Sequence, residues 1–242
     1  MAQMKLQMVD LVTQYQKIKP EVDRAIQNIL DSGQFILGKE VKDFENEVAA
    51  YLGVNYAIGC ASGTDALQIA MMTLGIGPGD EVITTPFTFV ATTETIVLLG
   101  AKPVYVDIDP KTYNIDPSRI EKAITKKTKA TIPVHLYGQS CEMDPIMDIS
   151  RKHSLPVIED NAQAIMAKED GKYTGTIGHM GVFSLNVHKH IQTGEGGIIV
   201  TKDDMLWGKI NGAINHGECR NQEAPGLNLR MTEITAAIAR EQ

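Results

Sequence analysis

The chain has 242 residues, of which 43% are hydrophobic and 22% are charged, and its formal net charge is −7. These values are typical of a globular protein that can bury a sizeable core. The acidic balance argues against a nucleic-acid-binding surface, because neutralising phosphates requires clustered Lys and Arg. The densest basic stretch, Lys122–Lys129, is explained by a solvated helix end followed by a turn.

The sequence also argues against a membrane span and a secretory signal. No apolar run approaches the roughly 20 residues that a membrane helix needs. Met1–Asp10 mixes polar and apolar residues without a hydrophobic stretch. The three cysteines, Cys60, Cys141 and Cys219, are widely spaced and lack the spacing of metal ligands. We therefore expect a cytoplasmic protein with buried or idle thiols and no metal site.

Apolar runs alternate with helical patterns along the chain. In chain order they predict helices at 22–30 and 41–52, a strand at 56–60, a helix at 64–74, a strand at 81–84, a helix at 88–99, a strand at 103–106, a helix at 117–124, a strand at 130–134, a helix at 143–153, a short strand at 157–158, paired strands at 181–185 and 197–201, and a helix at 232–240. Such alternation favours a layered α/β fold with a largely parallel sheet.

A Ser-Gly-Thr segment stands between the strand 56–60 and the helix that follows it. Backbone N–H groups and the helix dipole at such a junction can bind a phosphate. Gly63 would let the backbone approach the anion, and the hydroxyls of Ser62 and Thr64 could donate to it. The same residue types also cap helices that bind no ligand, so both interpretations stay open. Asp65 would repel a phosphate, and its side chain should point away from one.

Two further residues have the types and positions expected of a cofactor site. Asp160 follows an apolar strand, and strand-end carboxylates in an α/β sheet project into the ligand crevice, although Asp160 could equally cap a helix. Lys189 lies between His188 and His190, ahead of a glycine-rich turn. Such a lysine is usually solvated, but cationic neighbours or desolvation can lower the pKa of an amine and make it nucleophilic. Together with the phosphate cradle, an acid for a pyridine nitrogen and an imine-forming amine favour pyridoxal 5'-phosphate (PLP).

Ordered motifs along essentially the whole chain resemble the DegT/StrS family of PLP-dependent sugar aminotransferases, a branch of the fold-type I aspartate-aminotransferase superfamily. The motifs are Ser62–Leu67, Gly77–Ile83, Thr85–Thr92, Pro133–Gly138, Ile158–Ala164, Phe183-Ser184, Lys189, Thr193–Gly197 and Gly226–Met231. The resemblance implies a three-layer α/β/α large domain with a mixed, mostly parallel sheet. That domain would span residues 1–242 and include an N-terminal helical segment.

The resemblance also implies roles for individual residues. Lys189 would form the imine with PLP, and Asp160 would pair with the pyridinium nitrogen. Gln163 would hydrogen-bond the ring hydroxyl of the cofactor. Phe89, next to a loop and not in a strand, would stack on the ring. The phosphate would be held by the cradle at Ser62, Gly63 and Thr64, by Ser184 and, from the neighbouring subunit of a homodimer, by Asn228.

The implied reaction moves an amino group, with glutamate as the expected donor, to a nucleotide-activated ketosugar in surface-polysaccharide or deoxysugar biosynthesis. Lys189 would act as general base and acid between the donor α-carbon and the cofactor. Asp160 would keep the ring nitrogen protonated. The sequence identifies neither the sugar nor the nucleotide, and it does not distinguish a 3-keto from a 4-keto substrate.

Three departures from the family pattern keep alternatives open. Asn186–His190 replaces the usual His-Pro-Thr-Lys-Asn, and Met166 stands where a small residue is usual. The chain also ends within the helix predicted at 232–240, so we expect a truncated polypeptide without the family's small C-terminal domain. The alternatives are a catalytically incompetent or regulatory protein, a sugar dehydratase, in which histidine replaces the lysine, and a PLP lyase, which the motifs disfavour.

Overall fold

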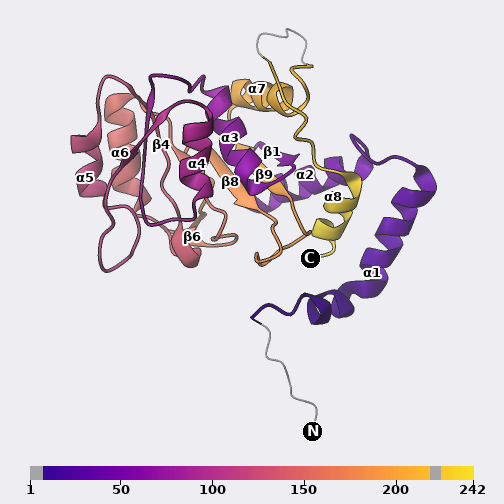
Figure 1. The fold of residues 1–242 in the computed structure, drawn as a ribbon. Helices are drawn as coiled ribbons and strands as arrows, with labels where there is room; N and C mark the ends of the chain where they lie inside the picture. Colours follow the sequence, from indigo (N-terminus) through magenta and orange to yellow (C-terminus); the bar gives the residue numbers. More distant parts are fainter. Residues whose placement is uncertain (1–7, 219–224) are drawn as a thin grey trace.

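The computed structural model describes residues 8–218 and 225–242, and Figure 1 shows how the elements are arranged. The helices are α1 (Leu11–Ser32), α2 (Lys39–Leu52), α3 (Gly63–Thr73), α4 (Ala91–Leu98), α5 (Pro117–Ala123), the 3-10 turn η1 (Leu136–Gly138), α6 (Met143–His153), α7 (Asp204–Ile214) and α8 (Glu233–Arg240). The strands are β1 (Tyr56–Cys60), β2 (Glu81–Thr84), β3 (Lys102–Tyr105), β4 (Thr128–Thr131), β5 (Ile158–Asp160), β6 (Lys168–Glu169), β7 (Lys172–Tyr173), β8 (Met180–Ser184) and β9 (Gly197–Thr201).

The central sheet consists of two groups of strands that meet at β5. One group has the order β1-β9-β8-β5 and the other β3-β2-β4. Parallel bridges join Thr131 to Val157 and Val134 to Asp160, and the Asp160 N–H donates to the Pro133 carbonyl at 2.9 Å. Only β9 runs against its neighbours β1 and β8 among the described strands of this sheet. The predicted mixed, mostly parallel sheet is therefore confirmed.

Successive side chains on the strands enter different cores. Val82 and Ile199 belong to the core beneath α3, α4 and α7. Their chain neighbours face the other way: Ile83 packs with residues of α5 and α6, and Ile198 with residues of α2 and α8. Because alternate residues of a strand point to opposite faces, helices cover both sides of the sheet. This arrangement confirms the three-layer α/β/α fold.

Several predicted boundaries match the structure and others differ by up to three residues, whereas the strands β6 and β7 were not predicted and two helices depart further from the prediction. The strands 56–60, 81–84 and 197–201 and the helix 143–153 have the predicted bounds. Helix α1 begins at Leu11, well before the predicted start at Val22, because the Asp10 carboxylate accepts from the Thr13 N–H at 3.0 Å and caps the first turn. Helix α7 was not predicted; Asp203 caps it by accepting N–H groups at 2.7 and 2.9 Å.

The N-terminal helical segment lies at one end of the molecule. In Figure 1, α1 stands at the opposite end from α5 and α6 and lies beside α8, with which it is in contact. Helix α8 also packs against α2. The Glu233 carboxylate at the start of α8 accepts N–H bonds from Gly38 at 2.7 Å and Glu40 at 2.8 Å. It thereby caps α2, whose own N-cap, Gly38, has no side chain to do so.

Within residues 8–218 and 225–242, no helix is long and apolar enough to cross a membrane. The thiols of Cys60 and Cys141 are free and buried, and burial raises the pKa of both. Buried thiols of this kind were predicted. Cys219 lies outside the described residues.

Candidate active site

The predicted phosphate cradle lies where β1 passes into α3. Ser62 is the N-cap of α3: its hydroxyl oxygen accepts from the Asp65 N–H at 3.1 Å and its proton is donated to the Asp65 carboxylate at 2.7 Å. The helix-capping interpretation therefore applies to Ser62. Its hydrogen-bonded proton also gives Asp65 a partner within the first turn of the helix. A phosphate at this junction would instead rely on backbone N–H groups and on the hydroxyls of half-buried Thr64 and Ser184.

Gly63 brings the cradle into contact with the end of β8. A Cβ atom at Gly63 would lie 2.7 Å from the Cβ of Ser184, which is too close for any side chain at this position without movement. Gly197 makes a similar approach on the next strand, because its Cβ would lie 2.2 Å from the Ser62 carbonyl oxygen. Two glycines thus hold the ends of β1, β8 and β9 close enough for Ser184 to share a site with Gly63 and Thr64.

Asp160 ends β5 as a buried carboxylate. Its Oδ2 accepts from the Thr92 hydroxyl at 2.8 Å, and its Oδ1 accepts from the Ala162 N–H at 3.2 Å. Burial raises the pKa of Asp160, whereas these two hydrogen bonds and the charge of Lys189 lower it. A carboxylate in this setting is stabilised further by any cation that approaches its free lone pairs.

Lys189 lies in the loop between β8 and β9 and is half-buried, with its N–H bonded to the Asn186 carbonyl at 2.8 Å. Burial lowers the pKa of the Lys189 amine, and the charge of Asp160 raises it. Asp160 ends β5 and the Lys189 loop follows β8, its parallel neighbour, so the two predicted catalytic residues come from the same end of the sheet. The flanking His188 and His190 are exposed.

Gln163 has the orientation that a donor to a cofactor oxygen requires. Its Oε1 accepts from the Tyr137 N–H at 3.0 Å. An N–H group can only face an acceptor, so this bond fixes which end of the amide is the oxygen. The NH2 group of Gln163 then points away from the Tyr137 backbone and can donate. Tyr137 adopts a left-handed backbone with φ 52° to make this contact.

Phe89 lies in the loop before α4, and 66% of its surface is exposed. It is therefore not a core aromatic, which leaves its face available to a ligand. Its carbonyl accepts from the Thr92 N–H at 3.3 Å. Thr92 in turn contacts Asp160, so Phe89 begins the same turn that reaches the buried carboxylate.

Asn228 is exposed and lies on a segment that runs beside the end of β1. The neighbouring Leu229 carbonyl accepts from the Ala61 N–H at 2.9 Å, and Arg230 forms a bridge with Cys60. Asn228 itself is paired with Asn215. The segment is therefore close to the cradle of its own subunit, and the proposed reach of Asn228 to a neighbouring subunit stays a prediction.

Two buried groups were missed by sequence reasoning. Thr92 lay within a quoted motif but received no role, although its hydroxyl binds Asp160. Glu159 is fully buried beside Asp160 and accepts N–H bonds from Gly175, Ile177 and Gly178 at 2.5–2.7 Å and a bond from His135 Nε2 at 2.9 Å. His135 Nδ1 accepts from a backbone N–H, so its Nε2 carries the proton. The sequence signal that could have identified Glu159 was the pair of adjacent acidic residues, Glu159 and Asp160, at the end of an apolar strand.

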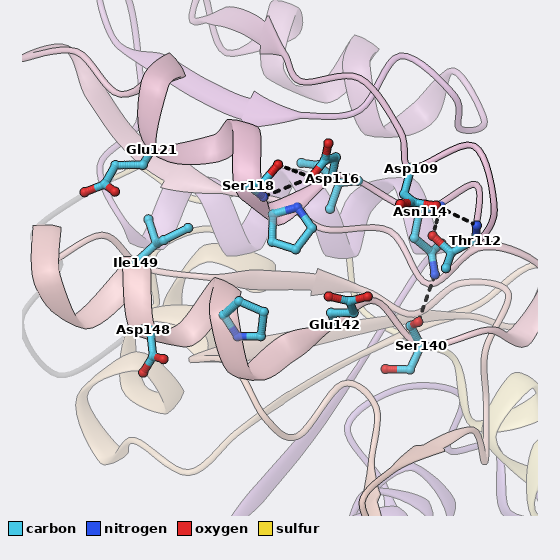
Figure 2. Close-up of a pocket in the computed structure, with 13 residues that line it drawn as sticks. Asp109, Thr112, Asn114, Asp116, Ser118, Glu121, Ser140, Glu142, Asp148 and Ile149 are labelled. Atoms are coloured by element: carbon cyan, nitrogen blue, oxygen red, sulfur yellow. Dashed lines mark hydrogen bonds between the residues drawn. The ribbon is translucent and has the colours of Figure 1, made fainter.

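A separate cavity of about 450 Å³ lies between the loop after β3 and the start of α6. Figure 2 shows that carboxylates line it, and that two of them, Asp109 and Asp116, bind groups close to them in the sequence. They are Asp109, Asp116, Glu121, Glu142 and Asp148. Asp116, for example, accepts from the Ser118 hydroxyl at 2.7 Å. No predicted cofactor residue is among the described residues that line this cavity.

Comparison with known proteins places the chain among aminotransferases. It is 48% identical over 238 residues to a pleiotropic regulatory protein of Geobacillus stearothermophilus, covering 97% of this chain and 64% of that protein. It is also 48% identical over 236 residues to UDP-2-acetamido-2-deoxy-3-oxo-D-glucuronate aminotransferase of Pseudomonas aeruginosa, covering 96% of this chain and 66% of that enzyme. The chain thus spans just under two thirds of the length of these relatives.

The fold and the family assignment agree. The crystal structure of DesV from S. venezuelae, in complex with a ketimine intermediate, has a TM-score of 0.93 and 39% sequence identity, and it covers 98% of this chain and 64% of DesV. The sequence profile of the DegT/DnrJ/EryC1/StrS aminotransferase family matches residues 16–242. The resemblance drawn from the sequence motifs is therefore confirmed, and the chain belongs to the DegT/DnrJ/EryC1/StrS aminotransferase family.

Proposed function

We propose that residues 1–242 form the cofactor-binding large domain of a PLP-dependent aminotransferase. The observation that carries this proposal is that Asp160 ends β5 and the Lys189 loop follows β8, the parallel neighbour of β5, so both side chains come from the same end of the sheet. They lie at the same edge of the sheet as the Gly63 and Ser184 cradle. Amine, acid and anion site are the three groups that PLP requires.

The residues present fit PLP. Gly63 leaves the space that a Cβ would fill beside Ser184, so backbone and hydroxyl groups can close on a phosphate. Asp160 offers a buried carboxylate that gains from a cationic partner. Gln163 presents its NH2 group, since its oxygen already accepts from Tyr137. When bound, PLP would supply the electron sink that stabilises negative charge on the amino-donor carbon.

The protein's own groups would do the rest of the chemistry. Burial lowers the pKa of Lys189, so a larger fraction of the amine is neutral and able to attack a carbonyl carbon. With the cofactor bound, the same amine would serve as the base and then the acid that moves the proton of the donor α-carbon. Asp160 would hold the proton on the ring nitrogen. Gln163 would orient the ring through its hydroxyl, and Phe89 would limit ring movement by stacking.

We further propose a nucleotide-activated 3- or 4-ketosugar as amino acceptor, glutamate as donor, a cytoplasmic location and a homodimer. The acceptor class is supported by the name of the Pseudomonas aeruginosa relative, which is an aminotransferase of a UDP-linked 3-oxo sugar. The homodimer is supported by the exposed position of Asn228 beside the cradle. A catalytically incompetent or regulatory protein is not favoured, because the chain retains both Lys189 and Asp160 in a common site.

The test is covalent capture of the cofactor in the full-length protein. Wild type saturated with PLP and reduced with borohydride should carry one phosphopyridoxyl group, found by peptide mass spectrometry at Lys189. Lys189→Ala should lose that adduct, whereas Lys209→Ala, an exposed lysine on α7, should keep it. An identical adduct in Lys189→Ala would contradict the assignment. Bleaching of the bound-cofactor absorbance by glutamate should separate an aminotransferase from a regulatory PLP-binding protein.

A further inference from the structure

A short chain of hydroxyl groups leads to the Asp160 carboxylate from α4. The Thr88 and Thr92 hydroxyl oxygens lie 3.0 Å apart, and the Thr92 oxygen lies 2.8 Å from Asp160 Oδ2. Thr92 is 1% exposed and Asp160 is 4% exposed, so water has little access to this contact. The Thr92–Asp160 bond does not follow from local secondary structure, because the two residues are 68 positions apart in the sequence.

The direction of each hydrogen bond follows from the chemistry of the groups. An ionised carboxylate can only accept, so the single proton of the Thr92 hydroxyl is donated to Asp160. The Thr92 oxygen is then the acceptor for Thr88, whose hydroxyl donates. Such a chain polarises each successive donor and strengthens the last bond, the one to the carboxylate. A donor that serves the charged form of a carboxyl group stabilises that form.

We propose that Thr92 is a positioning residue that keeps Asp160 ionised and aimed at the ring nitrogen of the cofactor, with Thr88 fixing the Thr92 hydroxyl. The inference rests on the proposed PLP site. Burial favours the neutral form of Asp160, and a neutral acid cannot hold a proton on the ring nitrogen. Thr92 opposes that effect on Oδ2 and the Ala162 N–H opposes it on Oδ1. Each oxygen keeps a further lone pair for the cofactor.

The other charged groups around Asp160 do not replace this hydroxyl. The Lys189 charge favours the ionised form, but within the described structure Lys189 makes no hydrogen bond to the Asp160 carboxylate. His135 accepts a backbone N–H on Nδ1 and binds Glu159 through Nε2, so both of its ring nitrogens have partners other than Asp160. Both carboxylate oxygens of Glu159 already accept hydrogen bonds, from backbone N–H groups and from His135. Among the described residues, Thr92 is thus the one whose side chain donates a hydrogen bond to the Asp160 carboxylate.

The experiment uses the full-length protein loaded with PLP labelled with ¹⁵N in its ring. The ¹⁵N chemical shift reports directly whether the ring nitrogen is protonated, and it is followed from pH 6 to pH 9. Thr92→Val removes the hydroxyl with little change of shape, and Thr92→Ser restores it. Thr95→Val is the matched control: Thr95 is equally buried on α4, but its hydroxyl donates to the Ala91 carbonyl at 2.9 Å.

Wild type, Thr92→Ser and Thr95→Val should show a protonated ring nitrogen across this range. Thr92→Val should lose protonation at a lower pH, and its rate with glutamate should fall about tenfold at saturating donor, the size expected for one charge-assisted hydrogen bond. A Thr92→Val spectrum that matches Thr95→Val would overturn the inference. Should Thr92→Val fail to fold, Thr88→Val must show a smaller shift in the same direction, and an unchanged spectrum would overturn it equally. Absence of PLP binding in wild type would instead refute the proposed function.

Discussion

Single carboxylates in this chain behave differently because their oxygens have different partners. Glu159 is buried and accepts from three N–H groups and an imidazole. Glu45 on α2 is also largely enclosed, but it accepts only from the Gly59 N–H, at 2.8 Å, among its described partners. Burial therefore raises the pKa of Glu45 to about 7, and the charge of Glu233 adds to the effect. At Glu45 a single hydrogen bond does not offset the cost of burying the charge.

Glu45 should make stability depend on pH in the range between its unfolded and folded pKa values. Those values are 4.5 and about 7, so the folded state binds the extra proton between them. The contribution to stability is then complete below pH 4.5 and is lost as pH rises through 7. The unfolding free energy of Glu45→Gln minus that of wild type should therefore rise by on the order of 2 kcal/mol from pH 5 to pH 8. Urea unfolding at both pH values measures this, and an equal difference at both would contradict it.

Gly63 should be required for cofactor affinity more than for folding. Gly63→Ala places a methyl group 2.7 Å from the Cβ of Ser184, which pushes the cradle open. We expect the PLP dissociation constant to rise at least tenfold, or about 1.4 kcal/mol, by equilibrium dialysis. Gly208→Ala is the matched control, since Gly208 lies in α7 with nothing within 4 Å of a new Cβ. That change should leave affinity unaltered and stabilise the helix by about 0.5–1 kcal/mol.

Between elements, the junction of α1, α2 and α8 depends on one capping carboxylate. Glu233 is 2% exposed and serves the N–H groups of Gly38 and Glu40. Without Glu233, these half-buried N–H groups at the start of α2 would lose their acceptor, and the N-cap residue Gly38 has no side chain to replace it. The cap also joins segments that are 195 positions apart in the sequence, so it links the two ends of the chain through hydrogen bonds.

Removing this cap should destabilise the protein strongly. Glu233→Ala leaves half-buried N–H groups without their acceptor and should cost about 1–3 kcal/mol of unfolding free energy. Glu233→Gln keeps an acceptor but loses the charge and should cost less. Trp207, the single tryptophan, stacks on Tyr56 with 4.9 Å between ring centroids, so its fluorescence can follow unfolding. Glu94→Ala on the exposed face of α4 serves as control, and equal losses in both variants would refute the capping role.

The elements and the main site residues could be predicted because their signals are local. Alternating apolar runs gave the strands, and Asp160 stands directly after one of them. The parts that were missed depend on contacts between distant residues. Whether Ser62 donates to a ligand or to Asp65, and which hydroxyl reaches Asp160, are choices of side-chain rotamer that only the packed layers decide. The start of α1 was missed because a capping residue, Asp10, stands well ahead of the apolar pattern.

On the scale of the whole molecule, the site gathers the ends of strands from the two groups of the sheet. β1, β8 and β9 contribute the cradle and the lysine loop, whereas α4, from the β2 group, contributes Thr92. Asp160 stands where the groups meet, and its own backbone takes part in joining them. The candidate active site therefore needs both groups of strands, and neither group contains all of its residues.

The join at Asp160 has a thermodynamic consequence. Its N–H binds the Pro133 carbonyl and its carbonyl accepts from the His135 N–H at 3.0 Å, so one half of the sheet cannot slide past the other without displacing the carboxylate. A ligand that binds only the aligned carboxylate then also opposes that sliding, by an amount set by its free concentration relative to its dissociation constant. Cofactor binding and the alignment of the two halves of the sheet are therefore thermodynamically linked.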